Sequence, residues 1–264
     1  MTEPGTNTSE VRWHKLRRDE IGAVASHDPV LLLPIGAIEQ HGPHLPIDTD
    51  TSAVTEVAVR AASLLPDGSA LVLPTIAWGL SPYWLPFAGT ITLRPETILA
   101  LISDMGRSVA AHGVRRMVIV NGHGGNAGII GVAATQLADH GVRALALSYW
   151  SVLGTELAER APGDHGLIGH AGQSETSIQL YLQPERVHAD FRSMTDWSDL
   201  EALRANPISG VGYQPPDPMT EAPNGVYGNA PMGDAAIGEW IIATAAERLA
   251  ELVRSLPGAQ RQWA

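Results

Sequence analysis

The 264-residue chain contains no cysteine. Disulfide bonds, thiolate metal sites and a cysteine nucleophile are therefore excluded. Basic residues are also few, because 17 Lys and Arg stand against 28 Asp and Glu, a formal net charge of −11 at pH 7. Proteins recognise nucleic acids and anionic membranes through basic patches. We therefore expect neither kind of partner.

Long apolar runs are missing as well, and we expect no signal peptide. No run approaches the ~20 apolar residues of a membrane span. The start, MTEPGTNTSEVRWHK, lacks the basic region and apolar core of a signal peptide. We therefore expect a cytoplasmic protein. Residues 1–10 are small and polar and are expected to be flexible, whereas residues 11–264 are expected to form one domain.

Apolar runs alternate with amphipathic segments along most of the chain. The runs predict strands at residues 29–36, 70–76, 115–120 and 142–149, with a short β segment at 89–93. Helical spacing of apolar residues predicts helices at 11–27, 52–65, 95–112, 127–140, 174–182 and 234–256. Continuous apolar strands are typical of parallel sheets. The pattern predicts an α/β fold with a mostly parallel sheet, while residues 185–230 stay unassigned.

The stretch LLLPIGAIEQHGPHLPIDTD, residues 31–50, collects possible metal ligands just past the first strand. Within twelve positions it contains Glu39, His41, His44, Asp48 and Asp50. Side chains at i and i+2 of an extended segment point to the same side, so Glu39 and His41 can converge. Carboxylates and imidazoles without thiolates suit zinc, manganese or iron. We expect His44 and Asp48 to be structural or to support the ligands.

A second strand ends in the same kind of residue. His123 follows the run RRMVIV in the motif NGHGGN. Ligands of open α/β sheets gather beyond the carboxyl ends of the strands, so His123 should lie near Glu39 and His41. Glu175 sits near a helix start. The carboxylates of Glu39, Asp50 and Glu175 would balance two divalent ions and one hydroxide. Two ions ~3.5–4 Å apart can polarise a carbonyl and supply a nucleophile.

Each of these residues has a simpler explanation when taken alone. A single His or Glu near a strand end is more often a hydrogen-bonding loop residue than a ligand. The sequence GHGGN could bind phosphate, but it lacks the GxGxxG spacing and the lysine of a P-loop. The aromatic cluster of Trp78, Tyr83 and Trp84 suits either the core or a pocket wall. Three further histidines are expected to face solvent: His112, His140 and His188.

Five motifs together resemble the creatininase (creatinine amidohydrolase) family: GAIEQHGPHLPIDTDT, FAGTITL, VNGHGGN, LSYW and HAGQSETS. They cover roughly residues 29–183, with a weaker similarity at 225–240. The resemblance implies a three-layer α/β/α fold and a two-metal hydrolase acting on carbon–nitrogen bonds. It also implies a homo-oligomer, often a hexamer.

The resemblance also implies roles for particular residues. One metal would be held by Glu39, Asp50 and His123. The other would be held by His41, Asp50 and Glu175, so that Asp50 bridges the pair. His170 matches the catalytic position that handles a proton near the scissile bond. Three positions are expected to contact substrate: Trp84, Gly124 and Trp150.

Three positions depart from creatininase itself. Gly125 stands where a glutamate is found, Gly166 stands where a tryptophan is found, and many relatives carry a histidine in the loop that here reads Tyr83–Pro86. Creatinine is therefore not the expected substrate. The hypothesis is a dinuclear amidohydrolase that uses metal-activated water to cleave a small cyclic amide or formamide. The alternatives are a peptidase or a cyclic keto-sugar hydrolase on the same metal centre, or a non-catalytic metal-binding protein.

Overall fold

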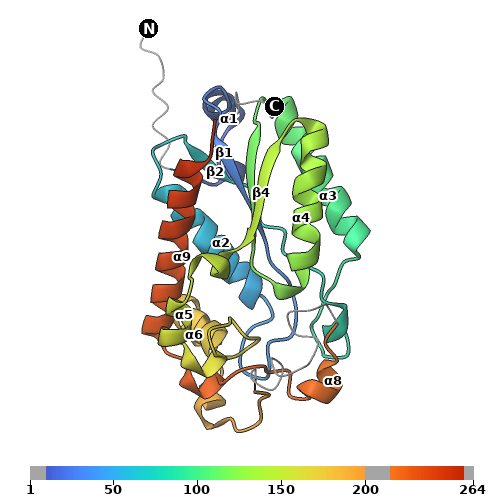
Figure 1. Cartoon of the computed structure of the whole chain (residues 1–264), viewed down its shortest axis with the longest axis vertical. Coiled ribbons are helices and arrows are strands. Elements are labelled where there is room, and N and C mark those ends of the chain that lie inside the picture. The colour runs from blue at the N-terminus through green and yellow to red at the C-terminus, as the bar shows by residue number, and fades with distance from the viewer. Residues whose placement is uncertain (1–9, 200–214, 259–264) are drawn as a thin grey trace.

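Four parallel strands form the centre of the protein in the computed structural model, which describes residues 10–199 and 215–258 (Figure 1). The strand order is β2-β1-β3-β4. The bounds are β1 Val30–Ile35, β2 Ala70–Val72, β3 Arg116–Asn121 and β4 Arg143–Ser148. Strands β1 and β3 pair in register from Val30 opposite Arg116 to Ile35 opposite Asn121. The two central strands therefore end side by side.

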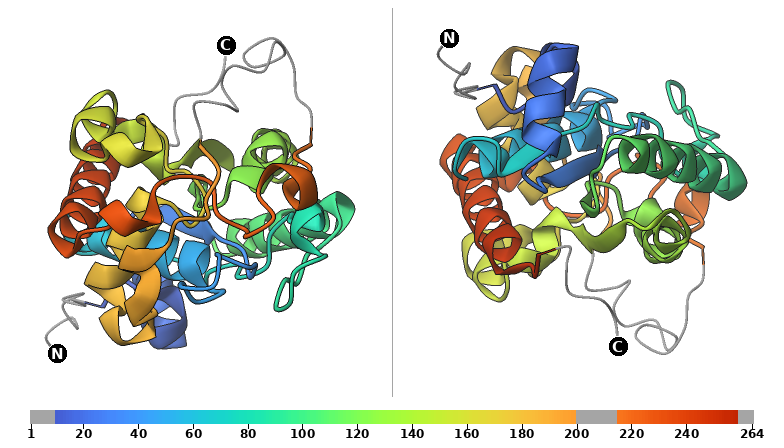
Figure 2. Two further views of the ribbon diagram at one scale, coloured as in Figure 1. Left: turned by 90° about the horizontal axis from the view of Figure 1, so that it is seen from below. Right: turned by 90° about the horizontal axis from the view of Figure 1, so that it is seen from above.

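Helices cover both faces of this sheet (Figure 2). Successive residues of a strand face opposite sides. Leu32 and Val118 accordingly pack into one core, whereas Leu31 and Met117 pack into the other. The first core is completed by α2 Thr49–Ser63, α6 Gln173–Leu182 and α9 Ala235–Ser255, and the second by α3 Pro95–Ala111 and α4 Ala127–Leu137. The three-layer α/β/α prediction with a parallel sheet is confirmed.

Two predicted β segments differ from the structure. Strand β2 ends at Val72, before the expected residue 76. Even-numbered residues of β1 bond toward β2, as Val30 N–H does to the Ser69 carbonyl, and Pro34 has no N–H with which to continue this ladder. The N–H of Leu73 still donates to the Leu32 carbonyl, and pairing with β1 resumes only at Ile76. The expected segment at 89–93 is reduced to one bridge between Ile91 and Ile38.

Two helix starts also differ from the prediction. Residues 11–27 contain a short 3₁₀ turn, Trp13–Lys15, and then α1, Arg18–Ala25. The backbone N–H of Arg17 donates to Glu20 Oε2 at 2.8 Å, which fixes the start of α1. Helix α2 begins at Thr49 instead of 52. Asp50 therefore lies in the first turn of a helix, not at the end of a loop.

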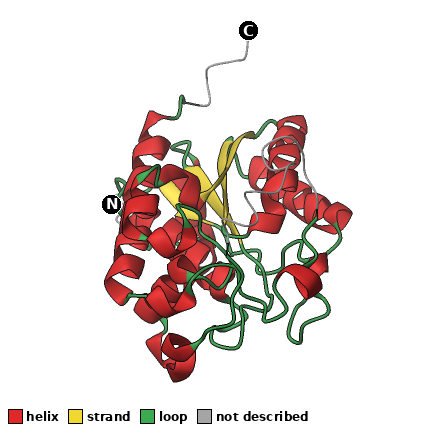
Figure 3. Ribbon diagram, turned by 60° about the horizontal axis from the view of Figure 1, so that its bottom comes forward, coloured by secondary structure: helices red, strands yellow, loops and turns green. Residues whose placement is uncertain are grey.

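The loops and short helices gather beyond the carboxyl ends of the strands (Figure 3). The short helices there are α5 Glu156–Arg160 and α8 Pro218–Glu221, and 3₁₀ turns include Pro82–Trp84, Gly124–Asn126 and Tyr149–Val152. The long C-terminal helix is confirmed as α9, and the Asp234 side chain caps it by accepting the N–H of Ala236 at 2.8 Å.

Some sequence expectations concern residues that the structure does not describe. Of the segment expected to be flexible, residues 1–9 lie outside the described residues, as do residues 200–214 of the unassigned segment and 259–264 at the other end. Within the described part of the chain, no helix combines the length and apolar character needed to cross a membrane. The single-domain division and the cytoplasmic location stay predictions.

Candidate metal centre

Five predicted ligands come together at the carboxyl edge of the sheet. Glu39 and His41 follow β1, and His123 follows β3. Asp50 lies in the first turn of α2, and Glu175 lies in the first turn of α6. All five residues are buried, with exposed fractions of 0–5%. Two strand ends and two helix starts therefore point at one small volume.

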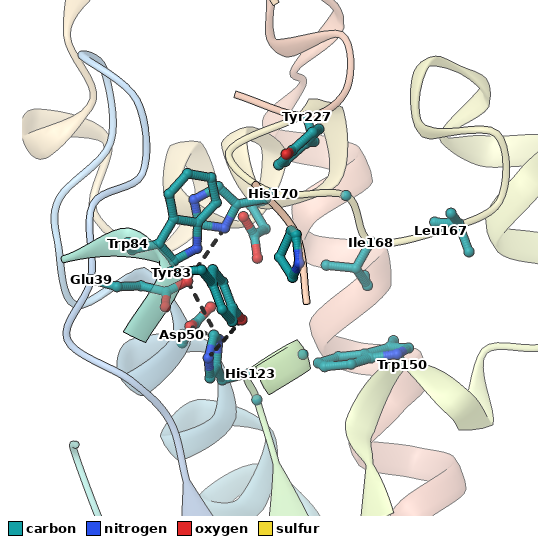
Figure 4. Close-up of a pocket in the computed structure, with 15 residues that line it drawn as sticks. Glu39, Asp50, Tyr83, Trp84, His123, Trp150, Leu167, Ile168, His170 and Tyr227 are labelled. Carbon is teal, nitrogen blue, oxygen red and sulfur yellow. Dashed lines mark hydrogen bonds and ion pairs between the residues drawn. The ribbon is translucent and has the colours of Figure 1, made fainter. Parts of the chain in front are cut away.

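The Asp50 carboxylate lies between two histidines. Its Oδ1 is 3.3 Å from His41 Nε2, and its Oδ2 is 3.1 Å from His123 Nδ1. Glu175 Oε2 stands 3.5 Å from His41 Nε2, and Glu39 Oε1 stands 3.4 Å from His123 Nδ1. The ligand atoms form two groups that share Asp50, one with Glu39 and His123 and one with His41 and Glu175. Figure 4 shows Glu39, Asp50 and His123 facing one another.

The buried atoms at the centre of this cluster fit a cation. Both carboxylate oxygens of Glu39, Nε2 of His41 and Oδ2 of Asp50 are buried, and none makes a well-directed hydrogen bond within the described residues; their ion-pair contacts are to one another, to Glu175, to His123 and to His170. A buried polar group without a partner costs free energy, and buried charges are normally paired or bound to metals. Three acids and two imidazoles are also the donor set that zinc, manganese and iron accept. The cluster therefore fits divalent metal ions.

Outer hydrogen bonds orient both histidines. The Nδ1 of His41 lies 3.1 Å from the Glu39 carbonyl oxygen, to which it can only donate. The Nε2 of His123 lies 3.1 Å from the Leu80 carbonyl oxygen and 3.1 Å from Ser81 Oγ. In each ring the other nitrogen then faces the carboxylates. A ligating histidine is usually held in this way, because the outer bond fixes the tautomer.

Burial and mutual charge shift the pKa values of the cluster strongly. Burial by itself would lower the pKa values of His41 and His123, but the adjacent carboxylates raise them to about 10 and about 9. Burial raises the pKa values of Glu39 and Glu175. Burial would also raise the pKa of Asp50, but the two histidines hold it below its usual range. Without metal, the cluster therefore retains protons at neutral pH.

Metal binding should accordingly release protons. Ligating imidazoles must be neutral, whereas pKa values near 10 and 9 keep His41 and His123 protonated at pH 7. Zinc affinity should therefore rise with pH up to about 9, about tenfold per pH unit for each proton displaced. Calorimetric titrations in two buffers of different ionisation enthalpy measure the proton release, with zinc added to a chelator as the control. An affinity independent of pH between 6.5 and 8.5 would contradict this.

His170, the predicted catalytic residue, lies against the same cluster. Its ring stacks between Trp84, at a centroid distance of 4.2 Å, and His41, at 4.4 Å. Its Nδ1 faces Glu39 Oε1 at 3.4 Å, and its Nε2 lies 2.9 Å from the Gln40 carbonyl oxygen. Burial, followed by the positive charge of His41, lowers the pKa of His170 well below its usual value. The ring is therefore rigidly held, neutral, and directed at the cluster by one nitrogen.

Gln40 is a site residue that the sequence analysis overlooked. Its side-chain nitrogen donates to the Gly225 carbonyl oxygen and lies 2.8 Å from His170 Nε2, while its Oε1 accepts the N–H of Gly42. Backbone bonds between His170 and Tyr227 attach the 225–228 segment to the same place. The position of Gln40 between the two predicted ligands Glu39 and His41 could have identified it from the sequence. Tyr227 could not be identified in this way, because it belongs to the segment 185–230 that was left unassigned.

The remaining histidines of the sequence analysis have different surroundings. His44 is buried, and its Nε2 lies 2.9 Å from Thr176 Oγ1, next to Glu175, which suits the structural role expected for it. His112 and His188 are exposed, as expected. His140 is half-buried instead, and its Nε2 bonds to Ser103 Oγ at 2.8 Å, so its prediction as solvent-facing is wrong. Asp48 is half-buried and immediately precedes α2.

The space beside Gly125 is already filled. A Cβ at this position would lie 2.2 Å from the Leu80 carbonyl oxygen, 2.5 Å from His123 Nε2 and 2.7 Å from the Tyr83 hydroxyl. The 80–83 loop therefore occupies the volume that a side chain at position 125 would need. Glu175 approaches His41 from α6 and supplies a carboxylate there. The departure from creatininase at Gly125 thus has a physical counterpart in the 80–83 loop.

Gly125→Ala should destabilise the protein. The added Cβ meets backbone and the His123 ring, which cannot move without disturbing the cluster. Overpacking of this kind costs about 1–3 kcal/mol, or roughly 2–10 °C in Tm for a chain of this size. Gly128→Ala is the matched control, because a Cβ there meets nothing within 4 Å. Thermal unfolding of both variants measures the difference, and equal Tm values would contradict the prediction.

A cavity of about 310 Å³ opens beside the cluster and contains all three expected substrate contacts, Trp84, Gly124 and Trp150, in its wall. Trp84 is 2% exposed, so it belongs both to a buried aromatic cluster and to the wall. Trp78 lies outside the wall and is 47% exposed. Gly166 has φ +78°, and a Cβ there would meet Ala158 at 2.7 Å, which explains why no tryptophan stands at this position.

A parallel α/β sheet with buried carboxylates and imidazoles at its carboxyl edge defines an α/β protein with a candidate metal centre and a ligand cavity. Comparisons with known proteins agree with this class. The creatininase family, described as creatinine amidohydrolase, matches residues 14–253. The chain therefore belongs to the creatininase family and is a hydrolase of that family.

Two relatives and one solved structure illustrate the similarity. A mycofactocin precursor peptide peptidase of Mycobacterium ulcerans is 36% identical over 242 residues, 87% of each chain. A creatinine amidohydrolase of Pseudomonas putida is 29% identical over 249 residues, 88% of this chain and 91% of the other. A crystal structure of creatinine amidohydrolase superposes with a TM-score of 0.77 at 30% identity, covering 93% of this chain and 97% of the other.

Proposed function

We propose that this protein is a dinuclear metal-dependent amidohydrolase that cleaves a carbon–nitrogen bond. The position of Asp50 supports this most directly, because its two oxygens face different histidines, each with its own second carboxylate. In this proposal Glu39, Asp50 and His123 hold one ion. His41, Asp50 and Glu175 hold the other. The ions are zinc, manganese or iron on the chemistry of the donor set.

The bound ions would polarise the substrate carbonyl and activate a water molecule. His170 handles the proton. Because its imidazole is neutral and its Nδ1 faces the cluster, it takes up a proton before it delivers one to the leaving nitrogen. The stacked Trp84 ring keeps His170 in this orientation. Trp150 and Gly124 border the space where the rest of the substrate lies.

The bond is proposed to be a cyclic amide or a formamide of a small molecule. A short peptide is the second candidate, because the peptidase relative is 36% identical over 87% of this chain. All three substrates present a carbonyl bound to nitrogen. We also expect a homo-oligomer, which light scattering after size exclusion would measure.

Metal content and a substrate panel test the proposal together. Mass spectrometry on protein purified without chelator or histidine tag should find two equivalents of metal per chain. The loaded protein should hydrolyse a member of a panel of cyclic amides, formamides and short peptides, with a cyclic keto-sugar included. Hydrolysis should stop in a chelator and return with added metal. Metal without turnover on any substrate would favour the non-catalytic alternative, and failure to bind zinc or manganese would overturn the proposal.

A further inference from the structure

We infer that the cavity selects substrates with an uncharged apolar group, aromatic or branched aliphatic, beside the scissile bond. The inference rests on the proposed function and adds a substrate class to it. It follows from which side chains form the wall of the cavity and from which kinds of side chain are lacking among the described residues of that wall.

Apolar side chains form the wall opposite the catalytic residues. Figure 4 shows Trp150, Ile168 and Leu167 along the side of the cavity that lies across from Trp84 and Glu39. Ile168 is 6% exposed and packs into the first core, the one that contains Leu32 and Val118, so it is a rigid part of the wall. Leu167 is 38% exposed and lies farther out. A substrate group that extends from the metal cluster toward this wall contacts aliphatic side chains and an indole ring.

The hydroxyl of Tyr227 is already hydrogen-bonded within the protein. Its hydroxyl donates to Glu221 Oε2 at 2.9 Å, so this bond already uses its hydrogen. Its ring is 6.0 Å from the Trp84 ring and lines the cavity together with it. Tyr227 therefore adds an aromatic face to the wall and offers no hydrogen for a substrate carboxylate.

No lysine or arginine is found among the described residues that line the cavity. The acidic and imidazole side chains among the described residues that line it are Glu39, Asp50, Glu175, His123 and the neutral His170. A substrate carboxylate against the outer wall would lose water without gaining a cationic partner, and an unpaired buried charge is strongly unfavourable. The wall thus favours neutral groups and disfavours anions away from the metals.

The volume agrees with a group of this size. About 310 Å³ lies at the lower end of cavities that bind small organic ligands. Burying a side chain as large as that of phenylalanine against such a wall should strengthen binding by about 10–100-fold over a methyl group. A short branched aliphatic group should gain less, because it covers less apolar surface.

Three hydroxamate ligands distinguish binding at the apolar wall from binding at the metal centre. Acetohydroxamate carries the metal-binding head alone, phenylacetohydroxamate adds a ring, and succinate monohydroxamate adds a carboxylate. Calorimetry on the metal-loaded full-length protein should show phenylacetohydroxamate binding about 10–100-fold more tightly than acetohydroxamate. Succinate monohydroxamate should bind no more tightly than acetohydroxamate. Equal affinity for all three would overturn the apolar subsite and leave the dinuclear proposal intact. No binding of acetohydroxamate to loaded protein would overturn both.

Leu167→Arg provides a test by gain of binding. The outer position of Leu167 lets an arginine place its charge at the cavity without being buried. The variant should bind succinate monohydroxamate about 2–5-fold more tightly, the range of an exposed ion pair, and should lose part of the preference for the ring. Leu101→Arg is the matched control, since Leu101 is also 38% exposed but lies in α3, outside the cavity wall. Tighter binding of succinate monohydroxamate by the Leu101 variant, or unchanged binding by the Leu167 variant, would contradict the proposal that Leu167 lines the substrate site.

Discussion

Replacing Asp50 with alanine should remove both metal ions at once. Each Asp50 oxygen faces a different histidine, at 3.3 Å and 3.1 Å, and each of the two groups that contain Asp50 has only two other members. Without Asp50, neither group retains three ligands. Removing even a supporting residue of a metal ligand typically lowers affinity 10–100-fold, so losing a shared ligand should exceed that at both sites. Metal content per chain should therefore fall from two equivalents to none.

Two further variants test whether the loss of both ions results from Asp50 being a ligand of each. Glu175→Gln should weaken only the site of His41, because Glu175 belongs to that group alone. Asp48→Ala removes a half-buried carboxylate two positions away and should leave both ions in place. Circular dichroism on every variant shows whether the fold is retained. If Asp50→Ala protein still carried two ions, the shared-ligand geometry would be refuted.

His170→Ala should keep both metals and lose turnover. His170 faces Glu39 at 3.4 Å but is not needed to complete either three-residue group that contains Asp50. Loss of a positioned proton-transfer group typically slows a reaction by 10²–10⁴-fold. The expected result is a kcat lower by this factor, with metal content unchanged.

The volume of the ring needs its own control. His170 packs between Trp84 and His41, so alanine leaves a gap that could disturb both. His170→Gln fills most of this gap without supplying an imidazole, and it should be equally inactive. His188→Ala changes an exposed histidine outside the cavity and should retain full activity. Unchanged turnover in both His170 variants would remove the proton-transfer role.

Much of the fold was predictable because strand and helix patterns are local. A charge-free run such as Val30–Ile35 shows a buried parallel strand without knowledge of its neighbours. The meeting of Glu39, His41 and His123 was predictable for the same reason, since parallel strands end at one edge of a sheet. The prediction failed where one residue changes a backbone bond. Pro34 in β1 has no N–H to continue the ladder with β2, and the N–H of Arg17 bonded to Glu20 delays the start of α1.

By itself the sequence determined the α/β alternation with a mostly parallel sheet, the edge of the sheet that carries the site and the ligand types, because each follows from short-range periodicity and residue chemistry. Only the tertiary structure decided what surrounds those ligands. The Leu80 carbonyl and Tyr83 close the space at Gly125, Gln40 holds His170, and residues 167–168 form the outer wall. These contacts join residues about 40 to 130 positions apart. No local pattern encodes them, because they depend on how the loops beyond the sheet pack against one another.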